Sequence, residues 1–452
     1  MDYGHNVSYH WITITFVCSH WRRVAIETSA LWKHIVLHKF GYMNTLLERS
    51  RKAPLSIICW HNLLRTRNPT PQHPAIDQLG PHLPRVERAH IIFDSEYPTP
   101  TSIYTLLSSY CAPTLRCISL KNIYWSPSPE PGAELDDWVK QDQYSPRSLC
   151  FEMIHHNTVK LMVGSHLRHL YMNNVTWHNV EMFLSILKKT PELESLICVG
   201  SIRRAPNTPY SMVALPRLRL LRIYLGTIPV LSTFLQHLTY PAIVTVDLKA
   251  VVMIPSLRSS RYLEELDINM SLKHLFPKDL SALTVTPDVT NVVFESTNFT
   301  LRIDCPYDKH GRLISRLSSC EVNGALQSLT LGPSIDSYEV HKWSAGTYEG
   351  IQTGACNVQY LSVPSTYYLR QLLFPSIRHR MNTASVGPIP LHKLKKLYIG
   401  KRRNEDLQIL CNILEARMKQ GYVLDEIYVP YEDNHSVYKS LAQLVRKVYM
   451  RS

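Results

Sequence analysis

The sequence predicts an α/β solenoid, in which a parallel sheet forms one face and helices form the other. The first observation is a short pattern, Pro-x-apolar-x-x-apolar-x-apolar, that begins at Pro191, Pro216 and Pro241. Successive copies therefore start 25 residues apart, and a fixed period of about 20 to 50 residues is typical of repeat architectures. Two earlier copies of the same pattern begin at Pro84 and Pro113.

The second observation is a helical pattern ahead of the strand-like octets. Val180, Phe183, Leu184 and Leu187 are spaced at i, i+3, i+4 and i+7, which is one face of a helix. A helix of about 11 residues and a strand of about 5 residues have nearly equal lengths, so both fit in one repeat. Because a strand that always returns through a helix is parallel to its neighbours, we expect a parallel sheet. One such unit cannot bury its apolar face alone, so the units stack.

The apolar triplet at the centre of the pattern continues along the chain. Further copies start at Leu167, Leu263, Val289, Leu326, Val358, Leu394 and Leu424. Their spacing resembles the L-x-x-L-x-L of leucine-rich repeats, although the Asn that usually follows is mostly absent, so the repeats are degenerate. A helix is expected from Asn404 to Lys419, with Gly421 beyond its end. A last helix, from Val437 to Val448, is expected to cap the array.

Composition limits the class of protein. The 452 residues are 45% hydrophobic, which is enough for an extended core, and Lys plus Arg exceed Asp plus Glu by 49 to 36. The net charge of +13 permits acidic partners but identifies none. Nucleic acid is not expected as a partner, because the predicted outward positions carry no uniform stripe of basic and aromatic residues.

The sequence also limits where the protein works. No run of about 18 apolar residues occurs, so we expect no membrane span, and the N-terminus lacks the pattern of a secretory signal. Ten Cys are scattered without a C-x-x-C pair, which is typical of reduced thiols. The expected location is the cytoplasm or the nucleus.

No motif for catalysis or cofactor binding is found. The sequence contains no G-x-x-x-x-G-K, G-x-G-x-x-G, G-x-S-x-G or H-E-x-x-H pattern and only 16 Gly, so phosphate-binding loops are not expected. The best metal candidates are His155, His156, His166 and His169, but no Cys or carboxylate has a matching spacing. We interpret these His as surface residues and expect no enzyme, no cofactor and no metal.

The N-terminal segment predicts a small pair of helices. Val17, Trp21, Val24 and Ala25 are spaced as a narrow apolar stripe, and Ser29 can begin a second short helix with Leu31 and Trp32. From spacing alone, this pair would be a helical hairpin that packs against the start of the solenoid.

The residue string in this segment has a resemblance of its own. It reads V-C-S-H-W-R-R-V-A from Val17, followed by S-A-L-W from Ser29, and Ala53-Pro54-Leu55 comes later. This resembles the second half of an F-box and the junction of F-box-like proteins with degenerate leucine-rich repeats, a group expanded in mushroom-forming fungi. The Leu-Pro-x-Glu-apolar helix that opens an F-box is missing from the sequence. The resemblance implies adaptor contacts by Val17, Cys18, Trp21, Leu31 and Trp32.

These observations predict three parts of the chain. Residues 1–40 are a truncated F-box-like helical segment, residues 41–83 are a junction and Pro-rich linker, and residues 84–452 are the leucine-rich-repeat-like solenoid. A Pro-rich and acidic stretch near 126–146 is expected to be a flexible insertion, and its Ser-Pro pairs are candidates for phosphorylation.

The open face of the predicted sheet is the candidate binding surface, because residues alternate between the two faces of a strand. The residues predicted to point outward are Lys121, His169, Tyr171, Asn173, Arg222, Tyr224, Asp247, Lys249, Glu265, Asp267, Lys396 and Tyr398. Tyr together with both signs of charge suits protein recognition.

Two functions remain open at this stage. The resemblance implies the substrate-recognition subunit of a Skp–cullin–F-box type ubiquitin ligase, with a Skp-type adaptor and a cullin as partners and an unknown target protein on the solenoid. The alternative is a non-catalytic repeat scaffold for protein–protein interaction without a ligase role.

Overall fold

A computed structural model describes most of the chain. The described residues are 9–37, 40–62, 78–94, 114–123, 146–154, 156–204, 211–242, 244–251, 282–287, 291–297, 299–304, 326–331, 357–365, 391–401, 406–430 and 435–451. The predicted insertion near 126–146 lies outside them except for its last residue, and the triplet from Leu263 lies wholly outside them.

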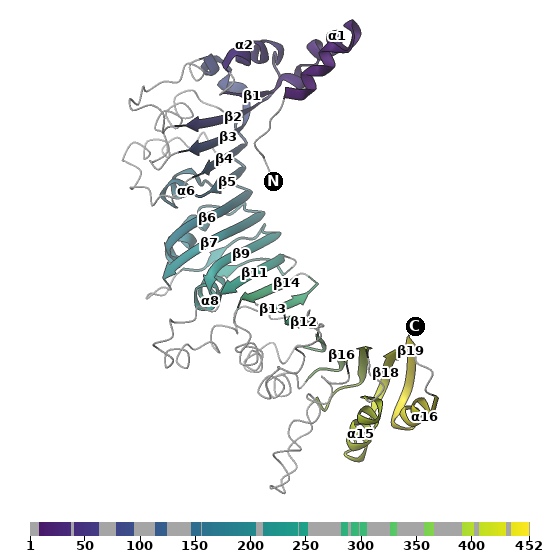
Figure 1. Ribbon diagram of the computed structural model, residues 1–452. Helices are drawn as coiled ribbons and strands as arrows, with labels where there is room; N and C mark the ends of the chain where they lie inside the picture. Colours follow the sequence, from purple (N-terminus) through teal and green to yellow (C-terminus); the bar gives the residue numbers. More distant parts are fainter. Residues whose placement is uncertain are drawn as a thin grey trace. The chain divides into compact units, whose positions relative to one another are not determined.

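The structure is mixed α/β, and its strand pairs are mostly parallel (Figure 1). The chain forms two compact units: unit 1 is Met1–Tyr224 with His237–Val244, and unit 2 is Leu225–Gln236 with Thr245–Ser452.

Unit 1 contains a parallel ladder in which each strand pairs with the next one along the chain. The strands are β1 (His34–Val36), β2 (Leu55–Asn62), β3 (Val86–Asp94), β4 (Cys117–Asn122), β5 (Ser148–Glu152), β6 (His169–Asn179) and β7 (Ser195–Arg204). β9 (Leu220–Thr227) follows β7 and runs on into unit 2. The short strands β8 (Val213–Ala214) and β10 (Leu238–Thr239) form a separate parallel pair.

Helices connect several of these parallel strands, as the repeat pattern predicts. α6 (His156–Met162) links β5 to β6, and α7 (Val180–Leu187) links β6 to β7. α7 begins where predicted, because the Asn179 side chain accepts a hydrogen bond from the Met182 backbone N–H at 2.9 Å, an N-cap contact. Its buried face contains Val180, Phe183, Leu184, Ile186 and Leu187.

The remaining helices of unit 1 lie ahead of or between the first strands. They are η1 (Tyr9–Phe16), α1 (Ser19–Glu27), η2 (Ser29–Trp32), α2 (Phe40–Arg49) and η4 (Gly80–Arg85). Arg85 ties η4 to the end of α2: its guanidinium donates to the backbone carbonyl of Leu47 at 3.1 Å and to that of Arg51. A cation at these carbonyls also complements the helix dipole.

The core of unit 1 consists of aligned rows of apolar side chains. The register places Ala89, Ile118, Leu149, Leu170 and Leu196 beside one another on successive strands, and all five are buried. The predicted triplets from Val86, Leu115, Leu167, Leu193 and Leu218 are buried throughout. Each buried Val, Leu, Ile or Met side chain among them contributes about 1.5–3 kcal/mol, so these rows hold the strands together.

Two strands of the parallel ladder in unit 1, β1 and β5, carry buried apolar residues that the sequence pattern did not predict. Trp32, Ile35 and Leu37 have the triplet spacing and are all buried, and Ile35 pairs with Ile57 of β2. β5 contributes Leu149 and Phe151 to the buried rows. The parallel ladder therefore already includes β1 and β2, ahead of residue 84.

Unit 2 contains a second set of strands with helices between some of them. The strands are β11 (Thr245–Val251), β12 (Ala282–Pro287), β13 (Asn291–Ser296), β14 (Phe299–Asp304), β15 (Ser328–Leu331), β16 (Tyr360–Ser365), β17 (Lys396–Lys401), β18 (Leu424–Pro430) and β19 (Val445–Arg451). The helices are α8 (Ile228–Gln236), α15 (Asp406–Lys419) and α16 (His435–Leu444). β15 to β19 pair in parallel, each with the next (Figure 1).

One part of unit 2 contradicts the expectation of an all-parallel ladder. The triplet from Val289 lies in and next to β13, and β13 is antiparallel to both β12 and β14. The connections are only residues 288–290 and 297–298, which are too short for a crossover helix, so the strands form hairpins. β14 then pairs in parallel with β11, and β12 with β15.

The last predicted helix is also corrected. α16 ends at Leu444, and Val445–Arg451 form β19, which pairs in parallel with β18. The β-branched and aromatic residues Val445, Val448 and Tyr449 favour a strand. The preceding helix α15 agrees with the prediction: it ends at Lys419, and Gly421 beyond it has φ +88°, a conformation that glycine adopts at helix ends.

Candidate protein-binding surfaces

Exposed apolar side chains concentrate on the N-terminal helices. Of the large hydrophobic residues that are exposed in the described ranges, six lie on or beside η1, α1 and η2: Ile14, Phe16, Val17, Trp21, Val24 and Leu31. Phe16, Val17 and Trp21 have exposed fractions of 73%, 67% and 48%. We call these six residues the N-terminal apolar surface. Such a concentration of exposed apolar residues makes this surface a candidate interaction site.

This arrangement corrects the predicted apolar stripe. Val17 lies ahead of α1, because Cys18 is extended, with φ −160°, and the helix begins at Ser19. Trp21 and Val24 therefore face solvent, and Ala25 is the buried residue of α1. The two helical segments do not form a hairpin that buries Val17, Trp21 and Val24 against the ladder.

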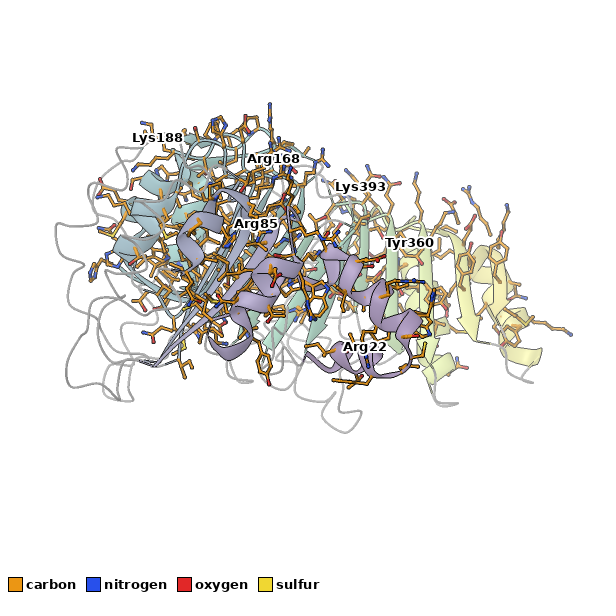
Figure 2. All side chains as sticks on the ribbon, turned by 90° about the horizontal axis from the view of Figure 1, so that it is seen from above. Arg22, Arg85, Arg168, Lys188, Tyr360 and Lys393 are labelled. Carbon is orange, nitrogen blue, oxygen red and sulfur yellow. The ribbon has the colours of Figure 1, made fainter. Side chains whose placement is uncertain are left out.

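Polar contacts hold the N-terminal apolar surface in place. Figure 2 labels Arg22 on the N-terminal helices. Its side chain donates from Nε to the backbone carbonyl of Thr15 at 2.9 Å, which joins α1 to η1. The Trp32 indole donates from Nε1 to the Ala25 carbonyl at 2.7 Å. The Arg49 guanidinium of α2 lies 4.4 Å from the centre of the Trp32 ring, a cation–π contact.

The five residues that the F-box resemblance selects divide into two groups. Val17, Cys18, Trp21 and Leu31 are exposed, whereas Trp32 has an exposed fraction of 1%. Trp32 thus anchors α1 to the first rung of the ladder. Sequence reasoning did not find Phe16 and Ile14, because the 3₁₀ helix η1 has no 3.6-residue period.

The open face of unit 1 is the second candidate surface. The register aligns Lys121 with Glu152 and Asn173 in one row, and Ser119 with Cys150 and Tyr171 in the next. Lys121 and Glu152 form an ion pair at 3.0 Å. His169 and Tyr171 are exposed, while Arg222 and Tyr224 of β9 are partly exposed between the buried Leu221, Ile223 and Leu225.

The titrating groups on this face respond to burial and to one another. Burial, then Cys150 and Glu152, raise the pKa of Tyr171, and Arg222 lowers it. Burial and then Lys121 lower the pKa of His90, which Glu152 partly opposes. Burial raises the pKa of Cys150. Burial and the nearby Lys121 therefore favour the neutral form of His90.

The open face of unit 2 contains a column of tyrosines. The register places Tyr398, Tyr428 and Tyr449 on successive strands. The Tyr398 and Tyr428 ring centres are 6.2 Å apart, and those of Tyr428 and Tyr449 are 4.7 Å apart with an interplanar angle of 12°. The second pair is stacked, a geometry that stabilises aromatic contacts.

A column of charges lies two residues before the tyrosines. Lys396, Glu426 and Lys447 are neighbours in the register, and Lys396 pairs with Glu426 at 3.0 Å. The Tyr428 hydroxyl donates to the same carboxylate at 2.9 Å. The side-chain hydrogen bonds from Lys396 and then Tyr428 lower the pKa of Glu426. Sequence reasoning selected Lys396 and Tyr398; it missed Lys447 and Tyr449 because β19 was predicted to be helical.

The remaining residues predicted on the open face are placed as follows. Asp247 and Lys249 are partly exposed on β11, and Asp247 is aligned with Thr300 of β14. Glu265 and Asp267 lie outside the described residues. The described members thus fall on open faces of two units, each of which is a separate candidate surface.

The remaining His and Cys residues of the described ranges are placed as follows. Within them, no group of three or more His, Cys, Asp or Glu is placed to hold a metal ion. His156, which the sequence placed at the surface, is buried instead, because its ring packs on Trp177 and His178 with ring centres 5.8 Å and 4.8 Å away. Cys18, Cys59, Cys117, Cys150, Cys198 and Cys411 are free thiols. None of the helices in the described ranges has the length and apolar content of a membrane span.

Comparison with known proteins leaves the family open. No protein-family model and no curated protein matches the chain. The class of protein is therefore set by the structure alone, as a mixed α/β protein with mostly parallel strand pairing, and the F-box resemblance stays a prediction.

Proposed function

We propose that this chain is the substrate-recognition subunit of a Skp–cullin–F-box type ubiquitin ligase. The N-terminal apolar surface would bind the adaptor, and a leucine-rich-repeat-like solenoid would hold a target protein on its open face. The chain performs no chemistry in this proposal. It raises the effective concentration of the target near the ubiquitin-carrying enzyme.

The observation that carries the proposal is the exposure of Val17, Trp21 and Leu31. These residues fall at motif positions that the F-box resemblance assigns to adaptor contact, and they are apolar side chains left in solvent. Packing in the interior would be the ordinary use of such residues. Trp32 supports the same proposal indirectly, because its two contacts fix the helix that presents Trp21.

The open faces support the second half of the proposal. Tyr171 with Arg222 in unit 1, and Tyr428 with Tyr449 in unit 2, combine aromatic rings and charged groups on partly exposed strands. Tyr and Arg are the residue types that dominate the binding energy of protein interfaces. A target protein is therefore a better fit than a small ligand.

The test is co-purification of the chain with a Skp-type adaptor. We expect a complex that survives gel filtration, and we expect Val17→Glu with Trp21→Glu to weaken it at least about 30-fold, the loss typical of a hot spot. Met212→Glu is the matched control, because Met212 is also an exposed apolar residue of unit 1 but lies outside the N-terminal apolar surface.

The alternative, a repeat scaffold without a ligase role, is decided by the same experiment. If the chain folds and no adaptor or cullin is retained by it, the ligase role is wrong. Retention that is equally strong with the Val17 and Trp21 changes would refute the assignment of the surface.

A further inference from the structure

The strands β17, β18 and β19 repeat one alternation of side chains. Each contains, in order, a charged residue, an apolar residue, a tyrosine and an apolar residue, with Gly or Pro or Arg later. The aligned sets are Lys396, Glu426 and Lys447; Leu397, Ile427 and Val448; Tyr398, Tyr428 and Tyr449; and Ile399, Val429 and Met450. Charge alternates in sign across the strands, whereas the other three sets keep their kind.

The outer side of β19 leaves this alternation incomplete. Within the described residues, β19 is paired with β18 and with no further strand. In the last apolar set, Ile399 of β17 and Val429 of β18 have exposed fractions of 2% and 1%, whereas Met450 of β19 has an exposed fraction of 50%. One face of the Tyr449 ring is stacked on Tyr428, and its other face points away from β18.

We propose that the outer edge of β19 binds an extended segment of a partner protein, which adds to the sheet as one more strand. An edge strand presents backbone N–H and C=O groups that a new strand can pair with. The segment that continues the rows has an acidic residue, an apolar residue, an aromatic residue and an apolar residue in that order.

Each position of that segment follows from a contact on β19. An acidic residue meets Lys447, as Glu426 does on the inner side. An aromatic ring stacks on the outward face of Tyr449, and the final apolar side chain covers Met450. Cross-strand pairs of these kinds are each worth about 0.2–1 kcal/mol, so the order of the residues confers specificity.

This inference goes beyond the proposed function, because a segment can add to β19 whether or not the N-terminal apolar surface binds an adaptor. The alternative is that β19 is a protected edge, which pairs with no further strand. Charged residues such as Arg446 and Lys447 can keep an edge strand from pairing at all. The experiment separates the two roles.

The probe is a fluorescent peptide with the sequence of β18, Leu424–Pro430, since this sequence already pairs with β19 in parallel. A second peptide has lysine in place of the glutamate at the position of Glu426, and a third has proline in place of the tyrosine at the position of Tyr428. Binding to the purified chain is measured by fluorescence anisotropy. A scrambled peptide gives the background.

We expect the β18 peptide to bind, and the proline peptide not to bind, because proline removes a backbone donor from the new strand. The lysine peptide and, separately, the variant Lys447→Glu should each weaken binding about fivefold. Combining the two changes should restore it. Lys439→Glu, on the exposed side of α16, is the control for net charge, and circular dichroism checks that each variant is folded.

Three results would overturn the proposal. The first is binding of the β18 peptide no stronger than that of the scrambled peptide, which leaves β19 as a protected edge only. The second is binding that the charge exchange at Lys447 does not affect. The third is self-association of the chain that Lys447→Glu changes, which would assign the edge to a second copy.

Discussion

The close approach of β6 and β7 at Gly200 yields a sharp prediction. The register of these strands shifts between Asn173 and Val175, and Asn174, with φ +55°, is the extra residue, which makes a β-bulge. Gly200 pairs with Val175 just beyond it. A Cβ atom at position 200 would lie 2.3 Å from the Val175 carbonyl oxygen, about 1 Å inside normal contact.

The change Gly200→Ala therefore forces two backbones apart. Overpacking of this kind costs about 1–3 kcal/mol, and a weakened ladder hydrogen bond adds about 0.5–1.5 kcal/mol. We expect a total near 3 kcal/mol, which corresponds to amide hydrogen exchange roughly 100-fold faster in β6 and β7 when exchange follows local opening. Mass spectrometry of peptides that cover residues 169–204 measures it directly.

Gly421→Ala is the matched control for this experiment. Gly421 has φ +88° and no atom within 4 Å of an added Cβ, so only the backbone conformation resists alanine, at about 1–2 kcal/mol. Its effect should appear around α15 and not in β6 or β7. Unchanged exchange in β6 and β7 of Gly200→Ala would show that the bulge does not bring the two strands this close.

Three further predictions concern unit 1. Trp32→Ala should destabilise it by about 3–5 kcal/mol, since a buried indole is removed, and limited proteolysis should then cut next to α1; Tyr42→Ala, at an exposed position of α2, is the control. Burial lowers the pKa of the partly buried His82 and His90 below 6.5, so the unfolded state takes up more protons below that pH. The urea midpoint should therefore be constant above about pH 7 and fall as the pH drops below 6.5, and His90→Gln should reduce the slope; an unchanged slope would mean that His90 does not contribute. Burial raises the pKa of Cys59 to about 12, so iodoacetamide should label exposed Cys18 well before Cys59; equal labelling rates in the native chain would contradict the buried position of Cys59.

The triplet pattern predicted the interior of the ladder well, and the reason is physical. For example, Leu193, Leu196 and Cys198 are all buried. Leu196 and Cys198 are two residues apart on β7 and therefore share one face of the strand, and Leu193 lies just ahead of the strand. The search missed β5 because Pro146 occupies the first triplet position. It missed β1 because Trp32 occupies that position and was assigned to the F-box-like segment instead.

Other features depend on the chain outside a single repeat. The triplet from Val289 has the same spacing as its neighbours, so nothing local reveals that β13 runs antiparallel; the short connections decide it. Val445 and Val448 fit both a helix and a strand, and pairing with β18 selects the strand. For the candidate surfaces, period two found Tyr171 and Tyr398, while the exposure of Phe16 depends on how η1 and α1 pack.

The hairpins β12–β13 and β13–β14 give unit 2 a starting point for folding. A parallel pair such as β16 and β17 joins residues far apart in the chain, and closing a loop of that length costs entropy before any contact forms. The two hairpins close loops of only a few residues, and hairpins form in about 1–10 μs. We therefore expect β12, β13 and β14 to pair early in folding. The outer edges of β14 and β12 are then available to pair with β11 and β15.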